Sequence, residues 1–282
     1  MWGRRTANRE LITFMRSTTK TAILNVMEAA ARKAARGLVR DFGEVEQLQV
    51  SRKGPADFVT AADLRAESIL KQELGHARPR YGFLLEEEGE VKGEDEHNRW
   101  IVDPLDGTTN FLHGLPHFAI SIAHERDGEI VAGVVYEPVH DELFWAEKGI
   151  GAFLNDRRLR VSGRSSLDQC LIATGLPYKG RDPEPRYVDT LEAMLAEVAG
   201  VRRFGSAALD LAYVAAGRYD GFWEFGLNAW DIAAGIVIVR EAGGMISGIR
   251  PNADPMTTGD ILAANGDVHV PVERLLRRAL RG

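Results

Sequence analysis

The chain contains a single cysteine, Cys170, among 282 residues. One cysteine excludes an intramolecular disulfide framework and a zinc site built from several cysteines. Because Cys170 lies in the apolar run "QCLIATG", we expect a buried and unreactive thiol.

Two other features are missing from the sequence. No apolar run approaches the ~20 residues that a membrane-spanning helix needs, and the basic N-terminus has no continuous apolar segment of the kind found in secretory signals. We therefore expect a cytoplasmic protein with no membrane partner, and we expect residues 1–17 to form an N-terminal extension without defined structure. The net charge of −6 argues against a nucleic-acid partner bound through phosphate neutralisation.

The pattern of apolar residues predicts a mixed α/β protein. Helical spacing covers residues 21–43 and 59–74, and hairpin patterns follow over 118–138 and 142–155. Helices and strands then alternate to the C-terminus. The polar stretch 162–168 is the nearest feature to a boundary. We therefore expect two tightly packed α/β subdomains, residues 18–161 and 162–282, with a site between them.

The segment "WIVDPLDGTTNFLHG", residues 100–114, places two carboxylates beside a predicted helix start. Asp103 ends an apolar strand, Pro104 keeps Asp103 extended, and Asp106 lies on the following turn. A helix that begins at Gly107 would point free N–H groups at an anion. Carboxylates alone would repel a phosphate, so the combination indicates divalent cations that bind both.

Further acids are available to complete a metal site. Glu86, Glu87 and Glu88 follow a predicted strand, and Asp231 begins an apolar helix. A set of oxygen ligands without His or Cys selects magnesium, manganese or calcium over zinc. Two such cations about 3.5–4 Å apart commonly serve phosphoryl transfer to water.

Each of these features also has a structural explanation. Asp-Pro and Asp-Gly pairs are ordinary turn signals, and a glutamate run is usually a solvated loop. Thr60 and Asp63 stand in the spacing of a helix capping box. The three histidines His113, His117 and His124 lack metal-ligand spacing, so we expect packing or surface roles. The combination of acidic patterns, rather than any one of them, favours a metal site.

With these motifs in this order, the sequence resembles the inositol monophosphatase family of magnesium-dependent, lithium-sensitive sugar phosphatases. The segments "WIVDPLDGTTNFLHGLPHFAISIA" and "WDIAAGIVIVREAGG" match its two signatures, and the resemblance runs from about Thr18 to the C-terminus. It implies a layered αβαβα sandwich and a homodimer. It also implies a phosphomonoesterase that hydrolyses inositol monophosphate or a similar sugar or polyol phosphate with metal-activated water.

The resemblance further implies roles for individual residues. The expected ligands of two to three Mg²⁺ ions are Glu86, Asp103, the Leu105 carbonyl, Asp106 and Asp231. Mn²⁺ is an alternative ion, and Li⁺ and Ca²⁺ are expected inhibitors. The expected catalytic residues are Asp63, Glu86 and Thr108, with the Thr108–Asp63 pair accepting a proton from the attacking water.

Two further groups of residues complete the expected site. The phosphate would lie on the N–H groups of Gly107, Thr108 and Thr109. The hydroxyls of the substrate would contact Asp106, Gly205, Ser206, Ala207 and Glu224.

Two positions depart from the family pattern. Leu85 stands before Glu86 where the family usually has glycine, and Glu88 follows Glu87 where it often has serine. Leucine does not easily take a backbone conformation reserved for glycine, so these departures leave the geometry of the Glu86 loop open. Glu88 either adds to metal affinity or points to solvent.

Other functions remain open at this point. Related family enzymes act on histidinol phosphate, fructose bisphosphate or an adenosine bisphosphate and share the metal site. A regulatory protein could keep the fold, bind a protein partner and lack turnover. A glycosidase could use two carboxylates as acid and base, but the phosphate-binding glycine and threonines would have no purpose in it.

Overall fold

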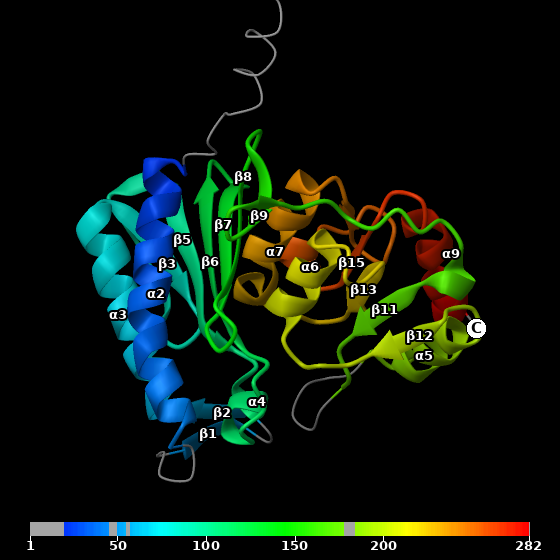
Figure 1. The fold of residues 1–282 in the computed structure, drawn as a ribbon, viewed down its shortest axis with the longest axis horizontal. Helices are drawn as coiled ribbons and strands as arrows, with labels where there is room; N and C mark the ends of the chain where they lie inside the picture. Colours follow the sequence, from blue (N-terminus) through cyan, green and yellow to red (C-terminus); the bar gives the residue numbers. More distant parts are fainter. Residues whose placement is uncertain (1–19, 45–49, 55–56, 178–183, 282) are drawn as a thin grey trace, which may run out of the picture.

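The computed structural model describes residues 20–44, 50–54, 57–177 and 184–281. For residues 50–54 and 57–59 it describes the backbone only. Helices and sheets alternate in five layers (Figure 1), which is the expected layered αβαβα sandwich. The first layer holds α2 (Ala22–Phe42) and α3 (Ala61–Ala77), and the middle layer holds α6 (Ala207–Ala215) and α7 (Ala229–Glu241). The last layer holds α5 (Tyr187–Leu195) and α9 (His269–Arg281). Residues 1–17, the expected extension, lie outside the described residues.

The larger sheet lies between the first helix pair and α7. Its strand order is β10-β9-β8-β7-β6-β5-β3-β4, antiparallel except where β3 meets β5. The strands are β3 (Tyr81–Leu85), β4 (Gly89–Val91), β5 (Asp95–Asp106), β6 (Ala119–Arg126), β7 (Glu129–Glu137), β8 (Glu142–Glu147), β9 (Gly151–Leu154) and β10 (Arg157–Arg158). Asp127 and Gly128 join β6 to β7 with φ of 53° and 79°, the positive φ pair of a tight hairpin turn.

The smaller sheet has the order β12-β11-β13-β15-β14. Its strands are β11 (Leu171–Thr174), β12 (Gly200–Arg202), β13 (Gly221–Glu224), β14 (Met245–Ser247) and β15 (Ile261–Ala264). Strand β11 runs parallel to both neighbours, and Thr174 pairs with Trp223. The remaining elements are β1 (Val50–Gly54), β2 (Asp57–Thr60), α4 (Thr108–Leu112), η2 (Leu167–Gln169) and α8 (Pro255–Thr258). The apolar patterns did not predict β1, β2, β12 or α8.

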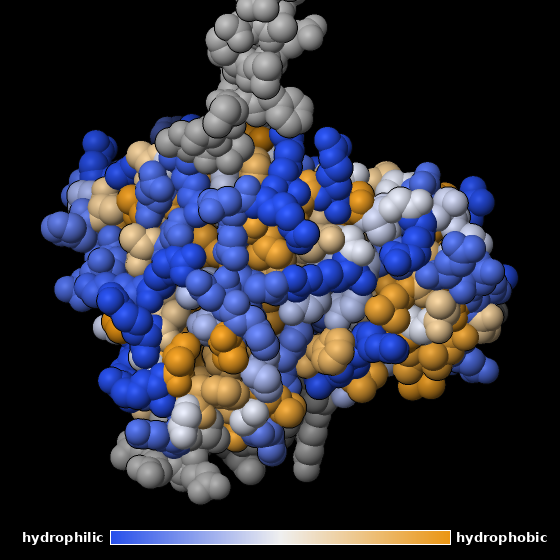
Figure 2. Space-filling model, viewed as in Figure 1, coloured by the Kyte–Doolittle hydropathy of each residue, from blue (hydrophilic) through white to orange (hydrophobic). Residues whose placement is uncertain are grey.

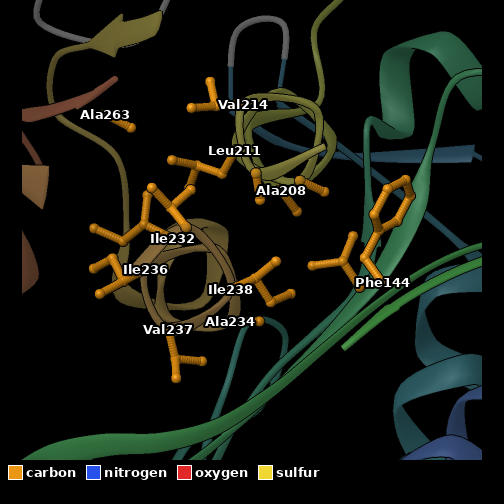
Figure 3. Close-up of a cluster of buried hydrophobic side chains, with 14 of the residues drawn as sticks. Phe144, Ala208, Leu211, Val214, Ile232, Ala234, Ile236, Val237, Ile238 and Ala263 are labelled. Carbon is orange, nitrogen blue, oxygen red and sulfur yellow. The ribbon is translucent and has the colours of Figure 1, made fainter. Parts of the chain in front are cut away.

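Helix α7 is apolar on all sides because both sheets and α6 surround it. Every residue from Ile232 to Val239 is buried, and Figure 3 shows the side chains of α6 and α7 filling the space between them. Gly235 allows the close approach of these helices, since a Cβ there would lie 2.4 Å from Leu211 Cδ1. This layer fixes the N-termini of α6 and α7. Each of these N-termini holds a carboxylate of the site described below.

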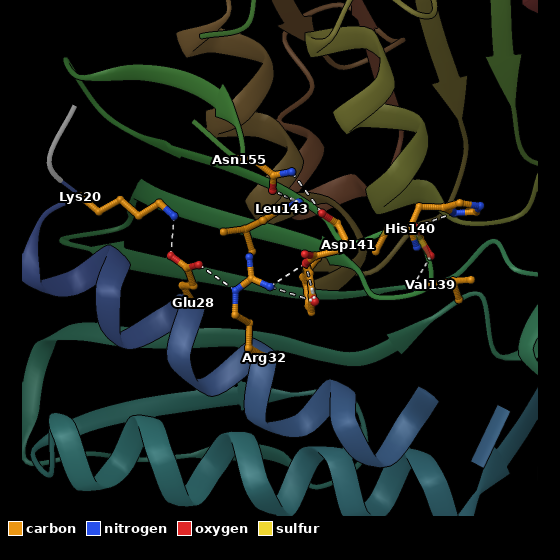
Figure 4. Close-up of polar contacts among 10 residues, drawn as sticks. Lys20, Glu28, Arg32, Val139, His140, Asp141, Leu143 and Asn155 are labelled. Atoms are coloured by element: carbon orange, nitrogen blue, oxygen red, sulfur yellow. Dashed lines mark hydrogen bonds and ion pairs between the residues drawn. The ribbon is translucent and has the colours of Figure 1, made fainter. Parts of the chain in front are cut away.

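Polar contacts attach α2 to the turn between β7 and β8 (Figure 4). The Arg32 guanidinium donates to Glu28 Oε1 at 2.8 Å and to Asp141 Oδ1 at 2.6 Å. It also lies 4.9 Å from the ring centroid of Tyr136. Because Asp141 is largely exposed, the ion pair contributes at most about 1 kcal/mol; the buried face of α2 supplies most of the packing energy.

Two expectations from composition can be compared with the structure. Cys170 is buried and unpaired, and burial raises the pKa of its thiol to about 11, so the expected unreactive thiol is confirmed. Within the described part of the chain, none of the helices combines the length and apolar character needed to cross a bilayer.

Candidate active site

A bulge in β5 brings the first two carboxylates together. The strand continues to Asp106 instead of ending at Asp103, so the expected boundary was wrong. Asp103 pairs with Ser121 and Asp106 with Ala119, so a three-residue step on β5 faces a two-residue step on β6. In a regular strand, residues three apart point to opposite faces. A bulge changes the direction of a side chain, and here it permits Asp103 and Asp106 to interact.

Four carboxylates form what we call the acidic cluster: Glu86, Asp103, Asp106 and Asp231. Burial raises the pKa of Asp103 well above its usual range, and the charges of Glu86, Asp106 and Asp231 raise it further. Asp103 also shares a side-chain hydrogen bond with Glu86. The end of β3, the end of β5 and the start of α7 therefore bring their acids within interaction range of one another.

Two members of the acidic cluster are oriented by helix N-termini. Asp106 Oδ2 accepts from Ser206 Oγ at 2.6 Å and from Ala208 N at 2.7 Å; burial nevertheless raises the pKa of Asp106 to about 6. Asp231 Oδ2 accepts from Asn228 N at 2.7 Å and completes the capping box of α7.

The chemistry of the acidic cluster fits hard divalent cations, because all its donors are oxygen atoms and their mutual repulsion favours a bound positive charge. The side chains do not form a complete coordination site in this structure. Among the described residues, no three His, Cys, Asp or Glu side chains are arranged to hold a metal ion. The Mg²⁺ ligands therefore stay a prediction.

Leu85, which precedes the glutamates, has an ordinary strand backbone. It is the last residue of β3, pairs with Val102 and is fully buried. Its φ is not among the positive values in the described residues, so this position does not use a conformation reserved for glycine. Glu67 of α3 holds the loop by accepting from Glu87 N at 2.8 Å and Glu88 N at 3.0 Å.

Glu88 is directed away from the acidic cluster. Both of its carboxylate oxygens lie 2.6 Å from Lys71 Nζ, and the side chain is 49% exposed. Of the two alternatives for Glu88, the structure therefore matches the solvent-facing one.

Asp63 interacts with two segments at once. Its Oδ2 accepts from Thr60 N at 2.9 Å and from the Thr60 hydroxyl, which forms the predicted capping box of α3. Its Oδ1 lies 3.2 Å from Thr108 Oγ1, which is also 3.0 Å from the Leu105 carbonyl. Burial raises the pKa of Asp63 despite these bonds. Both expectations for Asp63, helix cap and neighbour of Thr108, are met geometrically.

Gly107 turns the chain sharply between β5 and α4. Its φ is 95°, and a Cβ there would lie 2.9 Å from the His117 carbonyl oxygen. It precedes the five-residue helix α4, so the predicted helix start at this position is confirmed. Thr109 is exposed at its first turn. Asn110 secures the segment by donating to the carbonyls of His117 at 2.8 Å and Phe204 at 2.7 Å.

Apart from Asp106, the residues expected to contact substrate hydroxyls lie in the second half of the chain. Gly205, with a φ of 84°, precedes Ser206 and Ala207 at the start of α6, and Glu224 ends β13. The bonds from Ser206 and Ala208 to Asp106 join this half to the acidic cluster.

Sequence reasoning missed a buried acid in the same half. Asp210 of α6 is 1% exposed, its Oδ1 has no hydrogen-bond partner among the described residues, and burial raises its pKa well above normal. The charges of Glu224 and Asp106 raise the pKa of Asp210 further. The signal was available: one acid interrupts the otherwise apolar helix "AALDLAYVA".

The histidines have the packing and surface roles expected of them. His124 Nε2 lies 2.8 Å from Asn98 Oδ1, and its ring stacks on Tyr81. Burial lowers the pKa of both His117 and His124 to about 4, so both are neutral at pH 7. His113 is exposed.

Known proteins are similar to this chain in sequence and in fold. A family model described as "Inositol monophosphatase family" matches residues 19–280. An inositol-1-monophosphatase of Mesorhizobium japonicum is 58% identical over 262 residues, which cover 93% of this chain and 97% of that protein. The extragenic suppressor protein SuhB of Bartonella henselae has a crystal structure with a TM-score of 0.89 and 57% identity, covering 92% of this chain and 99% of that one. The Nus factor SuhB of Escherichia coli is 45% identical over 86% of this chain and 91% of its own length.

Proposed function

Because the chain belongs to the inositol monophosphatase family, we propose that it is a phosphomonoesterase that hydrolyses inositol monophosphate to inositol and inorganic phosphate. The substrate class comes from the relatives named inositol-1-monophosphatase, at 56–58% identity. The gathering of four carboxylates beside the Thr108–Asp63 pair carries the proposal, since hydrolysis needs both a site for cations and a group that accepts a proton.

The proposed metal site is the acidic cluster with the Leu105 carbonyl. When bound there, two or three Mg²⁺ ions would lower the pKa of a coordinated water and offset the charge of the ester. Mn²⁺ as a substitute and Li⁺ and Ca²⁺ as inhibitors belong to the same proposal, which the all-oxygen donor set supports.

Thr108 and Asp63 would orient the attacking water and receive its proton. The Thr108 hydroxyl lies 3.2 Å from Asp63 Oδ1, so it can pass a proton to this carboxylate while it holds the water. A positioned base of this kind is worth about 10²–10⁴ in rate. Glu86 would contribute as a ligand of the proposed cations, next to Asp103, whose pKa its charge raises.

The remaining residues would bind the two ends of the substrate. The N–H groups at Gly107, Thr108 and Thr109 begin a helix and would donate to phosphate oxygens. Gly205, Ser206 and Ala207 would lie beside the ring. The carboxylates of Asp106 and Glu224 would accept hydrogen bonds from its hydroxyls.

Phosphate release from inositol 1-phosphate, with magnesium varied and with EDTA as the control, tests the proposal. We expect release that depends on magnesium. A parallel panel of histidinol phosphate, fructose bisphosphate and adenosine bisphosphate ranks the related family substrates. Absence of release from every ester would contradict the phosphatase proposal and favour a regulatory protein with a protein partner, for which the 45% identical Nus factor SuhB is a relative.

Cytoplasmic location and homodimeric assembly are part of the same proposal. Apolar side chains gather over α5 in Figure 2, where Val188 is 68% and Leu195 58% exposed. Size-exclusion chromatography with light scattering would measure the assembly; a mass near 31.1 kDa would contradict the dimer.

A further inference from the structure

Gly175 lies beside Glu224 because of the register of the smaller sheet. Strands β11 and β13 run parallel, and their last pair joins Thr174 to Trp223. The next residues along the two strands are Gly175 and Glu224. Side chains at paired positions of neighbouring strands share one face of the sheet. The Glu224 side chain therefore lies on the face where Gly175 has no side chain.

The Glu224 carboxylate occupies the space that a side chain at residue 175 would need. A Cβ built on Gly175 would lie 2.0 Å from Glu224 Cδ and 2.1 and 2.2 Å from its two carboxylate oxygens. Gly175 has no left-handed φ. The glycine is thus required for space and not for backbone conformation.

Other groups surround the same carboxylate. Asp210 of α6 interacts with the charge of Glu224 from the middle helix layer. Tyr187 of α5 does so as well, and its hydroxyl lies 3.3 Å from Thr174 Oγ1. Groups on α5 and α6 therefore lie near the Glu224 carboxylate, and residue 175 provides the room that this carboxylate occupies.

We propose that Gly175 is a specificity-determining residue, because it sets the position from which the Glu224 carboxylate accepts hydrogen bonds from the hydroxyls of a polyol phosphate. The inference rests on the role given to Glu224 in the proposed function. The inference adds Gly175 to the substrate site as a residue that contributes by having no side chain.

A methyl group at residue 175 would act selectively. The atoms that it would meet are the far end of a flexible side chain, so Glu224 can turn away while the strands keep their register. Loss of one hydrogen bond to a charged group weakens binding by about 10–100-fold. The loss falls on esters that have hydroxyls for Glu224 to bind.

The test compares kcat/KM for inositol 1-phosphate with kcat/KM for 4-nitrophenyl phosphate, an ester without alcohol groups. We expect Gly175→Ala to lower the ratio of the two constants by about 10–100-fold, mostly through KM for the inositol ester. Gly163→Ala is the matched control, because a Cβ at this exposed glycine meets nothing within 4 Å, and its ratio should equal that of the wild type.

A double-mutant cycle assigns the effect to Glu224. In the Glu224→Ala background the carboxylate is gone, so adding Gly175→Ala should leave the ratio unchanged. An equal loss for both esters in Gly175→Ala, or a full further loss in the Glu224→Ala background, would overturn the inference. Wild-type protein that releases no phosphate from inositol 1-phosphate would instead overturn the proposed function, so the two failures are distinguishable.

Discussion

The two ends of the proposed site are built in different ways. At the phosphate end, Asp103, Asp106, Gly107 and Thr108 come from one continuous segment, folded by a bulge and a glycine turn. At the hydroxyl end, Gly175 follows β11, Asp210 lies in α6 and Glu224 ends β13. Much of the chemistry that every phosphate ester needs is encoded in one segment, to which Glu86 and Asp231 are added from elsewhere, whereas the proposed selectivity depends on sheet register and helix packing.

Asp231→Asn should have the largest effect, because it acts at the phosphate end. We expect a loss of at least about 10³ in kcat for both inositol 1-phosphate and 4-nitrophenyl phosphate, since one charge leaves the proposed cation site. Asparagine can still accept from Asn228 N, so the fold should survive, as a thermal unfolding curve would verify. Near wild-type turnover would disprove the metal assignment.

Thr108→Val should come next. Valine keeps the shape of threonine but removes the hydroxyl that lies 3.2 Å from Asp63. We expect kcat to fall by about 10²–10³ for both esters with little change in KM. Steady-state kinetics at saturating magnesium measures this, and a defect confined to inositol 1-phosphate would place Thr108 at the hydroxyl end instead.

Leu85→Gly tests stability rather than chemistry. Leu85 is fully buried in an ordinary strand, so its removal should cost about 3–5 kcal/mol of unfolding free energy. The magnesium concentration for half-maximal activity should stay the same at a temperature where the variant is folded. A lower magnesium requirement would show that Leu85 does strain the Glu86 loop.

Asp210→Asn should have the smallest effect, one that depends on pH. Burial raises the pKa of Asp210 in the folded state, so the wild type loses stability as pH rises above about 3.9, the usual value for an unfolded aspartate. Asparagine removes this loss. The melting temperature of the variant relative to wild type, measured in EDTA, should therefore increase by a few degrees from pH 4 to pH 8. A difference that does not change with pH would show that Asp210 remains ionised in the fold.

The sequence predicted the parts of the site that carry local signals. The T-x-x-D capping box located Asp63, and the Asp-Gly-Thr-Thr turn located the start of α4. It did not predict the bulge, because the pairing of Asp106 with Ala119 depends on the neighbouring strand. Nor could it indicate Gly175, whose importance comes from a carboxylate 49 residues away in the chain.

Leu85 shows the limit of a local rule. A rule about glycine conformation put the geometry of the Glu86 loop in question, but the backbone at this position is an ordinary strand. The rule holds only where φ is positive, and φ cannot be read from one sequence. The mixed α/β class was accessible because long apolar periods specify α2, α3 and α7, whereas short elements such as β12 and α8 depend on their surroundings. The layered arrangement followed from the family resemblance.

Asp63 divides its two oxygen atoms between different neighbours. Oδ2 is committed to the first turn of α3, while Oδ1 alone faces the Thr108 hydroxyl. A proton arriving through Thr108 would therefore settle on Oδ1 and leave the anchoring of α3 intact. The enzyme could then cycle between charged and neutral forms of this acid in every turnover without loosening the scaffold that holds it.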